Sequence, residues 1–111
     1  MSYRASKLDA LLQKEISTIL TRELSLKHGV FITIPRVKTT SDLRYSHVFV
    51  SVFPAKEASY AMKTIAHEQG NILKKLSRKL TIKSLPHISF VYDDTEERAD
   101  IIEKIFHDLQ L

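Results

Sequence analysis

The hydrophobic positions in the first 24 residues recur every three or four residues, which is the spacing of one face of an α-helix. The stripe consists of Leu8, Leu11, Leu12, Ile16, Ile19, Leu20 and Leu24. It predicts an amphipathic helix over Tyr3 to Leu24, because residues at this spacing share one side of a helix with 3.6 residues per turn. Gly29 follows the stripe and indicates where the chain leaves the helix.

Two segments that alternate between apolar and polar residues come next. Residues 30–40 and 45–53 both show this two-residue period, and in the second segment Val48, Val50 and Val52 share one side. Alternation of this kind is typical of a half-buried strand. Pro35 lacks the amide donor of a strand ladder, so it predicts an edge strand or a bulge. The short polar connection between the segments predicts an antiparallel hairpin.

The helical period returns after Pro54 and is followed by one more strand and one more helix. Residues 87–92 alternate as a strand, and residues 93–111 carry an apolar stripe at helical spacing. The predicted order is helix, strand, strand, helix, break, helix, strand, helix, which predicts an α+β fold with helices laid on a small sheet. The long helical crossover before the third strand favours one parallel strand pair.

The predicted break falls at Gly70, one of only two glycines in the chain. The stripe that runs through Met62 and Ile65 meets Glu68 and Gln69 where its next apolar residue is expected. Glycine is favoured just after a helix end, and Asn71 is a good N-cap for a following helix, so we expect two helices that meet at a sharp junction. The alternative is one continuous helix that tolerates the glycine at a cost of about 1 kcal/mol.

The helix after this junction carries a cluster of basic residues. Lys74, Lys75, Arg78 and Lys79 are expected on the side opposite Ile72, Leu73, Leu76 and Leu80, and no acidic residue occurs between Glu68 and Asp93. A helix that begins at a break also presents free amide groups and the positive end of its dipole. The pattern predicts a phosphate-binding face, and the alternative is an ordinary solvated surface.

Charge is distributed unevenly along the 111 residues, which we expect to form one domain. Residues 1–92 contain fifteen Lys or Arg and six Asp or Glu, a net charge of +9, whereas residues 93–111 contain two and seven, a net charge of −5. A basic body favours a polyanionic partner. No apolar run approaches the ~18 residues of a membrane span, so we expect a cytoplasmic protein that makes no membrane contact.

The residues that usually carry chemistry show no productive spacing. The chain has no cysteine, and HEQGN places Asn71 where the zinc motif H-E-x-x-H needs its second histidine. Two glycines cannot build a phosphate-binding glycine loop, and the five histidines fall in separate predicted elements. We therefore predict no catalytic residues, no metal and no cofactor, and a binding protein rather than an enzyme.

Three segments of the chain resemble the ribosome-binding factor A family. They are KEISTIL at the end of the first helix, VFITIPRVKTTSDLRYSHVFVSVF, and GNILKKLSRKLTIKSLPHISFVYDD. Their order and spacing carry the resemblance over nearly the whole chain. It implies a single type II KH-like domain over residues 1–111, with the order α-β-β-α-kink-α-β, a mixed three-stranded sheet and, in this chain, an added C-terminal helix.

The resemblance also implies a function. Members of the family bind the small ribosomal subunit and support the maturation and processing of 16S rRNA near its 5′ end, with a role in growth in the cold. We accordingly expect a cytoplasmic monomer whose partner is the small subunit. The family has an Ala-x-Gly kink between its two helices, and here that position reads Glu68-Gln69-Gly70. The glycine matches and the alanine does not, which moves our prediction of RNA contact onto the basic residues that follow.

The residues predicted to bind rRNA form three groups. They are Lys74, Lys75, Arg78, Lys79 and Lys83 after the kink at Gly70 and Asn71; Arg36, Lys38 and Arg44 at the hairpin; and Arg4 and Lys7 in the first helix. Two alternatives remain open. One is a KH-like adaptor that contacts a ribosomal protein or an assembly GTPase rather than rRNA, and the other is a small hydrolase.

Overall fold

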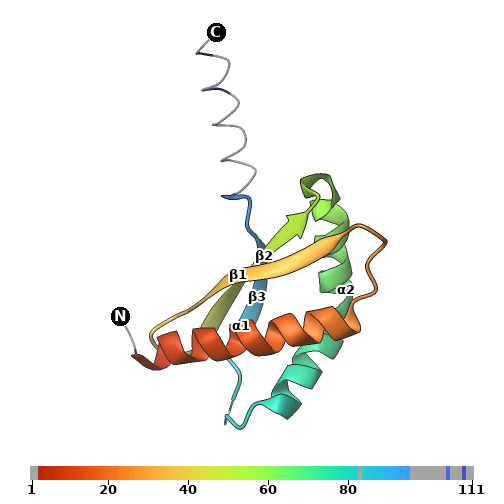
Figure 1. The fold of residues 1–111 in the computed structure, drawn as a ribbon. Helices are drawn as coiled ribbons and strands as arrows, with labels where there is room; N and C mark the ends of the chain where they lie inside the picture. Colours follow the sequence, from red (N-terminus) through yellow and green to blue (C-terminus); the bar gives the residue numbers. More distant parts are fainter. Residues whose placement is uncertain (1–2, 83, 96–104, 106–108, 110–111) are drawn as a thin grey trace.

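Two long helices and a three-stranded sheet make up the protein in this computed structural model, which describes residues 3–82, 84–95, 105 and 109. Figure 1 shows the arrangement of the elements. They are α1 (Tyr3–Glu23), β1 (Phe31–Thr39), β2 (Tyr45–Phe53), the 3₁₀ turn η1 (Ala55–Glu57), α2 (Ala58–Lys79) and β3 (His87–Tyr92). The α+β class is confirmed.

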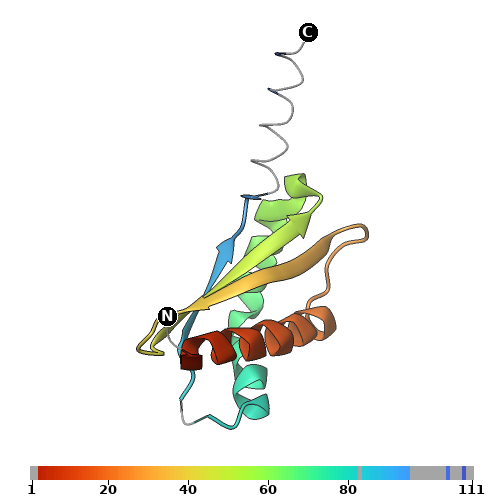
Figure 2. The same cartoon turned by 60° about the vertical axis from the view of Figure 1, so that its left-hand side comes forward.

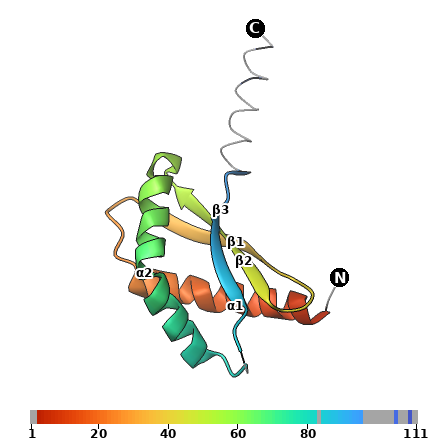
Figure 3. The same cartoon turned by 180° about the vertical axis from the view of Figure 1, so that it is seen from behind.

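The sheet has the order β1-β2-β3, with β1 antiparallel and β3 parallel to the central strand β2. The antiparallel pair is the predicted hairpin. The parallel pair is possible because α2 carries the chain back to the start of the sheet before β3 begins. Figure 3 shows β3 beside β2, with α2 and α1 packed against the sheet. The mixed three-stranded sheet is therefore also confirmed.

Both helices cover the same face of the sheet, and the core lies between these two layers. Val48, Val50 and Val52 of β2 are buried, as the two-residue alternation predicted. They pack in one cluster with residues of α1 and α2, including Leu12, Ile16, Ile65, Ile72 and Leu76. Burying a side chain of this size contributes about 1.5–3 kcal/mol. Figure 2 shows the helices on one side of the sheet, and no described helix lies on the other.

A β-bulge at Ile34 and Pro35 changes which residues of β1 face the core. Thr33 pairs with Ser51 and Arg36 with Phe49, so two residues of β1 stand opposite one residue of β2. The extra residue reverses the alternation, which leaves Arg36 exposed and buries the next residue. The Gln13 side chain of α1 donates hydrogen bonds to the Ile34 and Pro35 carbonyl oxygens, at 2.9 and 3.2 Å. Proline therefore marks a bulge on an edge strand, as predicted.

The predicted break at Gly70 is wrong, because α2 continues through Gly70 and Asn71 without interruption. Gly70 is not in the left-handed conformation, and Asn71 lies inside the helix rather than at its start. Ile65 and Ile72 are seven residues apart, close to two full turns, so both face the core from one continuous helix. Packing of that stripe outweighs the cost of the glycine. The axis of α2 changes direction along its length in Figures 1 and 3, yet the helix does not end.

Two further predictions fall on residues that the structure does not describe. The predicted C-terminal helix over residues 93–111 lies outside the described residues except for Asp93, Asp94, Thr95, Ile105 and Leu109, and Lys83 lies outside them as well. Among the helical residues that are described, none belongs to a helix long and apolar enough to cross a membrane.

Candidate nucleic-acid interface

The four predicted bases of α2 do not share one face. At about 100° per residue, Lys74 and Arg78 lie about 120° or more from the buried Ile72, and both are exposed. Lys75 and Lys79 lie within about 60° of the buried Ile72, on the flank that meets α1. We call Lys74 and Arg78 the outer pair, and Lys75 and Lys79 the inner pair.

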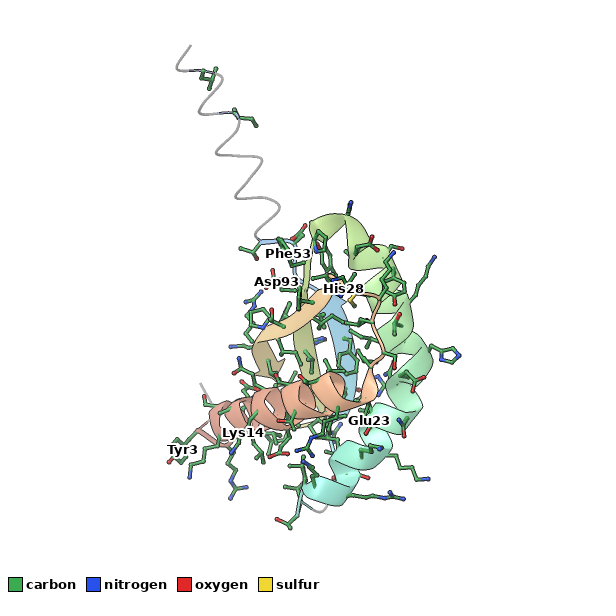
Figure 4. The ribbon with its side chains drawn as sticks, turned by 45° about the vertical axis from the view of Figure 1, so that its right-hand side comes forward. Tyr3, Lys14, Glu23, His28, Phe53 and Asp93 are labelled. Carbon is green, nitrogen blue, oxygen red and sulfur yellow. The ribbon has the colours of Figure 1, made fainter. Side chains whose placement is uncertain are left out.

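The inner pair is neutralised by carboxylates of α1. Lys75 Nζ lies 2.6 Å from Glu23 Oε1, and Lys79 Nζ lies 3.7 Å from Glu15 Oε2. The hydrogen bond from Lys75 is the main cause that lowers the pKa of Glu23, and Asn71 adds a hydrogen bond at 3.5 Å to the same carboxylate. Figure 4 shows Glu23 at the end of α1 beside α2. The lack of acidic residues between Glu68 and Asp93 in the sequence therefore does not leave the inner pair without compensating acids, and the expected phosphate-binding role is weakened for these two lysines.

The outer pair keeps its charge available. Neither Lys74 nor Arg78 makes an ion pair within the described part of the chain. Gly70 lies on the same exposed side of α2, and a Cβ placed there would meet no atom within 4 Å. This side of α2 is therefore basic at Lys74 and Arg78 and carries no side chain at Gly70, one turn before Lys74.

The three bases at the hairpin, Arg36, Lys38 and Arg44, are all exposed. The Arg36 guanidinium lies 4.0 Å from the centre of the Phe49 ring, a cation–π arrangement. Arg44 Nε lies 4.0 Å from Asp42 Oδ2 at the surface, where such pairs contribute little. We call these three residues the hairpin group.

Local hydrogen bonds fix the turn that carries Arg44. Asp42 Oδ1 accepts hydrogen bonds from the Thr40 hydroxyl at 2.6 Å and from the Arg44 amide at 3.0 Å. These bonds, the Thr40 hydroxyl first, lower the pKa of Asp42. Leu43 adopts a positive φ of 63°, which the tight turn requires. The Asp42 carboxylate is thus engaged mainly by the turn itself.

The first turns of α1 lie against the hairpin. A hollow of about 520 Å³ is lined by Ala5, Ser6 and Asp9 of α1 and by hairpin residues from Arg36 to Ser41 together with His47. Arg4 and Lys7 lie in the same part of α1 and are exposed, with Lys7 Nζ 4.7 Å from the centre of the Tyr3 ring. The structure therefore groups the α1 bases with the hairpin bases, whereas the outer pair lies on the other helix, α2.

Two features of the site were missed by the sequence analysis. The carboxylates of Glu15 and Glu23 come from another helix, so no local pattern around Lys75 could reveal them. The aromatic side of β2 was visible in the alternation, but only the position of both helices on the valine side shows that no described helix covers it. In the described residues, no three His, Asp or Glu side chains are gathered as metal ligands would be.

Comparison with known proteins covers nearly the whole chain. Residues 4–106 match the model of the Ribosome-binding factor A family. A ribosome-binding factor A from Dictyoglomus thermophilum is 35% identical over 113 residues, which span 100% of this chain and 94% of that protein.

Solved structures support the fold. The crystal structure of ribosome-binding factor A from Thermus thermophilus has a TM-score of 0.65 and 18% identity, and the match covers 79% of this chain and 93% of that one. A homology model of the Thermus thermophilus factor, fitted into a cryo-EM map of its 30S complex, has a TM-score of 0.62 and 19% identity over 78% of this chain and 91% of that one. The match along residues 4–106 and the identity over the full length place this chain in one family: it belongs to the ribosome-binding factor A family.

Proposed function

We propose that this protein is a ribosome assembly factor that binds the small ribosomal subunit through its 16S rRNA. Family membership over residues 4–106 is the observation that carries the proposal. The homology model of the Thermus thermophilus factor was fitted into the map of a 30S complex, which supports the small subunit as the partner. In this reading the chain is a single RNA-binding domain that acts without a cofactor and without catalysis.

The outer pair and the hairpin group supply the phosphate contacts. Lys74, Arg78, Arg36 and Lys38 are exposed and have no ion pair with a described acid. An unpaired cation gains the full attraction of a phosphate and releases a condensed counterion when it binds. Lys75 and Lys79 would first have to leave Glu23 and Glu15, so they contribute less.

Co-sedimentation with purified ribosomal particles tests the proposal. The full-length protein is incubated with small subunits, large subunits and intact ribosomes at physiological salt, and the pellets are assayed for it. We expect saturable binding to small subunits alone. Equal binding to all three particles would indicate non-specific attraction to RNA and would contradict the proposal.

The same assay distinguishes binding to rRNA from binding to a protein partner. Small-subunit rRNA stripped of ribosomal proteins should retain binding with a steep salt dependence. If only protein-containing particles bind, and the affinity is insensitive to salt, the chain is an adaptor for a ribosomal protein or an assembly GTPase.

The cellular role follows from the same proposal. A cytoplasmic factor for 16S rRNA maturation should, when depleted, leave precursor 16S rRNA with unprocessed 5′ ends, and the defect should deepen in the cold. Primer extension on RNA from depleted cells at two growth temperatures measures this. Normal 5′ ends at both temperatures would contradict the maturation role while leaving subunit binding intact.

A further inference from the structure

The face of the sheet that the helices do not cover carries a row of aromatic and basic side chains. Alternation and pairing register place these residues on it: Phe31, Thr33, Arg36 and Lys38 of β1; Tyr45, His47, Phe49, Ser51 and Phe53 of β2; His87, Ser89 and Val91 of β3. We call this set the open face. The bulge at Pro35 brings Arg36 and Lys38 onto it, because without the extra residue they would point to the core.

Large aromatic side chains on the open face are exposed to an unusual degree. Tyr45 is 51% exposed, Phe31 63% and Phe53 67%. Phe31 and Phe53 are paired across β1 and β2, and the Tyr45 ring lies 6.1 Å from the His87 ring in an edge-to-face arrangement. Phe53 is visible at the end of the sheet near Asp93 in Figure 4. Rings left in solvent in this number mark a surface that meets a partner.

The charges on the open face select the kind of partner. Its twelve residues include Arg36, Lys38 and two histidines, and no Asp or Glu occupies an outward position on the three strands. Arg36 rests on the Phe49 ring at 4.0 Å, so its flat guanidinium extends the aromatic surface and still carries its charge. A surface that offers flat rings and positive charge together is complementary to a polyanion with flat bases.

We infer that the open face binds single-stranded RNA by stacking unpaired bases on Tyr45, Phe53 and Phe31 and on the Arg36 guanidinium. This inference rests on the proposed function and names the kind of rRNA involved. A duplex hides the faces of its bases inside its own stack, so aromatic rings on a protein reach only unpaired nucleotides. Tyr45 and Phe53 are eight residues apart on one strand, roughly 26 Å, which gives room for several nucleotides.

A hollow beside Arg36 indicates how the bound RNA would lie on the open face. It has a volume of about 450 Å³ and is lined by Thr33, Pro35, Arg36, Ser51, Asp93 and Thr95. The Thr33 and Ser51 hydroxyl groups can exchange hydrogen bonds with a base edge or a ribose, while the Thr95 hydroxyl donates to the Asp93 carboxylate and can still accept one. The Asp93 carboxylate repels a phosphate at this end of the open face. The sugar-phosphate backbone of the RNA therefore runs on the side of Lys38, and its bases face the hollow.

The experiment measures binding of a fluorescein-labelled, unstructured CA-repeat RNA to the full chain by anisotropy over a range of salt concentrations. Tyr45→Leu and Phe53→Leu each remove one ring, while Tyr45→Phe and Phe53→Tyr keep it. We expect each leucine variant to bind at least about fivefold more weakly, because one base loses its stacking partner. The ring-retaining variants should bind like the wild type. The slope of log affinity against log salt should not change, because no phosphate contact is lost.

The outcomes distinguish this inference from the proposed function. If the wild type binds small subunits but not the CA-repeat RNA, the open face is not a stacking platform, although the proposed function stands. If it binds the RNA with the expected ring dependence but does not bind small subunits, the inference stands and the proposed function fails. If the leucine variants bind normally and instead unfold at lower urea concentration, another part of the protein covers the open face and the inference is overturned.

Discussion

The bases of α2 and the bases of the hairpin carry the same charge but have different neighbours. On α2, Lys75 and Lys79 point along the boundary with α1 and pair with its carboxylates. On the hairpin, Arg36 lies on an aromatic ring and Lys38 has no ion pair with a described acid. A run of basic residues in a sequence therefore does not show how much positive charge a partner meets. Acidic residues of another helix neutralise part of that charge, and they come close only when the chain folds.

The largest expected effect separates bases with acid partners from bases without them. Changing Arg36, Lys38, Lys74 and Arg78 together to Gln should make the slope of log affinity against log salt shallower by about three units. At physiological salt this corresponds to a loss of about two orders of magnitude in affinity for small subunits or their rRNA. Titrations at several salt concentrations measure both quantities, and circular dichroism checks the fold. Weaker binding with an unchanged slope would show that these residues make no phosphate contacts.

The next prediction concerns the hydrogen bonds by which α1 holds the β-bulge. Gln13→Ala removes both hydrogen bonds to the Ile34 and Pro35 carbonyl oxygens, so we expect a loss of about 1 kcal/mol in the free energy of unfolding. Urea denaturation measures this, with the neighbouring exposed Lys14→Ala as the control. An unchanged midpoint for Gln13→Ala would mean that water satisfies these carbonyl groups and that α1 does not hold the bulge.

The continuity of α2 predicts a stabilising change of similar size. Gly70→Ala should raise the free energy of unfolding by up to about 1 kcal/mol, because the helix gains propensity and the new methyl group meets open space. Gly29→Ala is the matched control and should destabilise, because Gly29 has a φ of +86°. If Gly70→Ala also lowers the urea midpoint, residue 70 has a non-helical conformation in solution.

A smaller effect is expected from the inner pair. Changing Lys75 and Lys79 to Gln should alter the salt slope by less than about half a unit, because their charges are already matched by Glu23 and Glu15. The Glu23→Gln variant should release Lys75 and steepen the slope. If the salt slope falls as much for the inner-pair variant as for a variant of Lys74 and Arg78, all four bases of α2 reach the RNA.

The smallest effect concerns pH. The pKa of Glu23 is lowered mainly by the hydrogen bond from Lys75, so this carboxylate stabilises the fold when the pH is above its unfolded-state pKa. The contribution is lost as the pH falls through the lowered folded-state pKa. Thermal melts between neutral and acidic pH should therefore show a flatter acid limb for Glu23→Gln than for the wild type. Identical limbs would mean that the ion pair contributes no measurable stability at the surface.

Sequence alone determined the positions of α1 and of the three strands and the hairpin of β1 and β2. Its break in α2 was wrong, and its C-terminal helix over residues 93–111 stays a prediction. The stripe in α1 and the three alternating valines of β2 depend only on local periodicity, and apart from the exposed Leu11 each residue lies in the core or packs against it, as predicted. The bulge was readable because Pro35 lacks the amide that a regular ladder needs. The crossover through α2 made the parallel pair of β2 and β3 readable in the same way.

Only the tertiary structure decided the behaviour of Gly70 and the neighbours of the basic residues. Local propensity favours a helix end at a glycine, but Ile65 and Ile72 are both buried against the sheet, and this packing outweighs a penalty of about 1 kcal/mol. Glu15 and Glu23 are far from Lys79 and Lys75 in the sequence, so their pairing exists only once α1 and α2 are docked. The exposure of Tyr45 and Phe53 was equally hidden, because alternation divides a strand into two sides and only packing shows which side the helices cover.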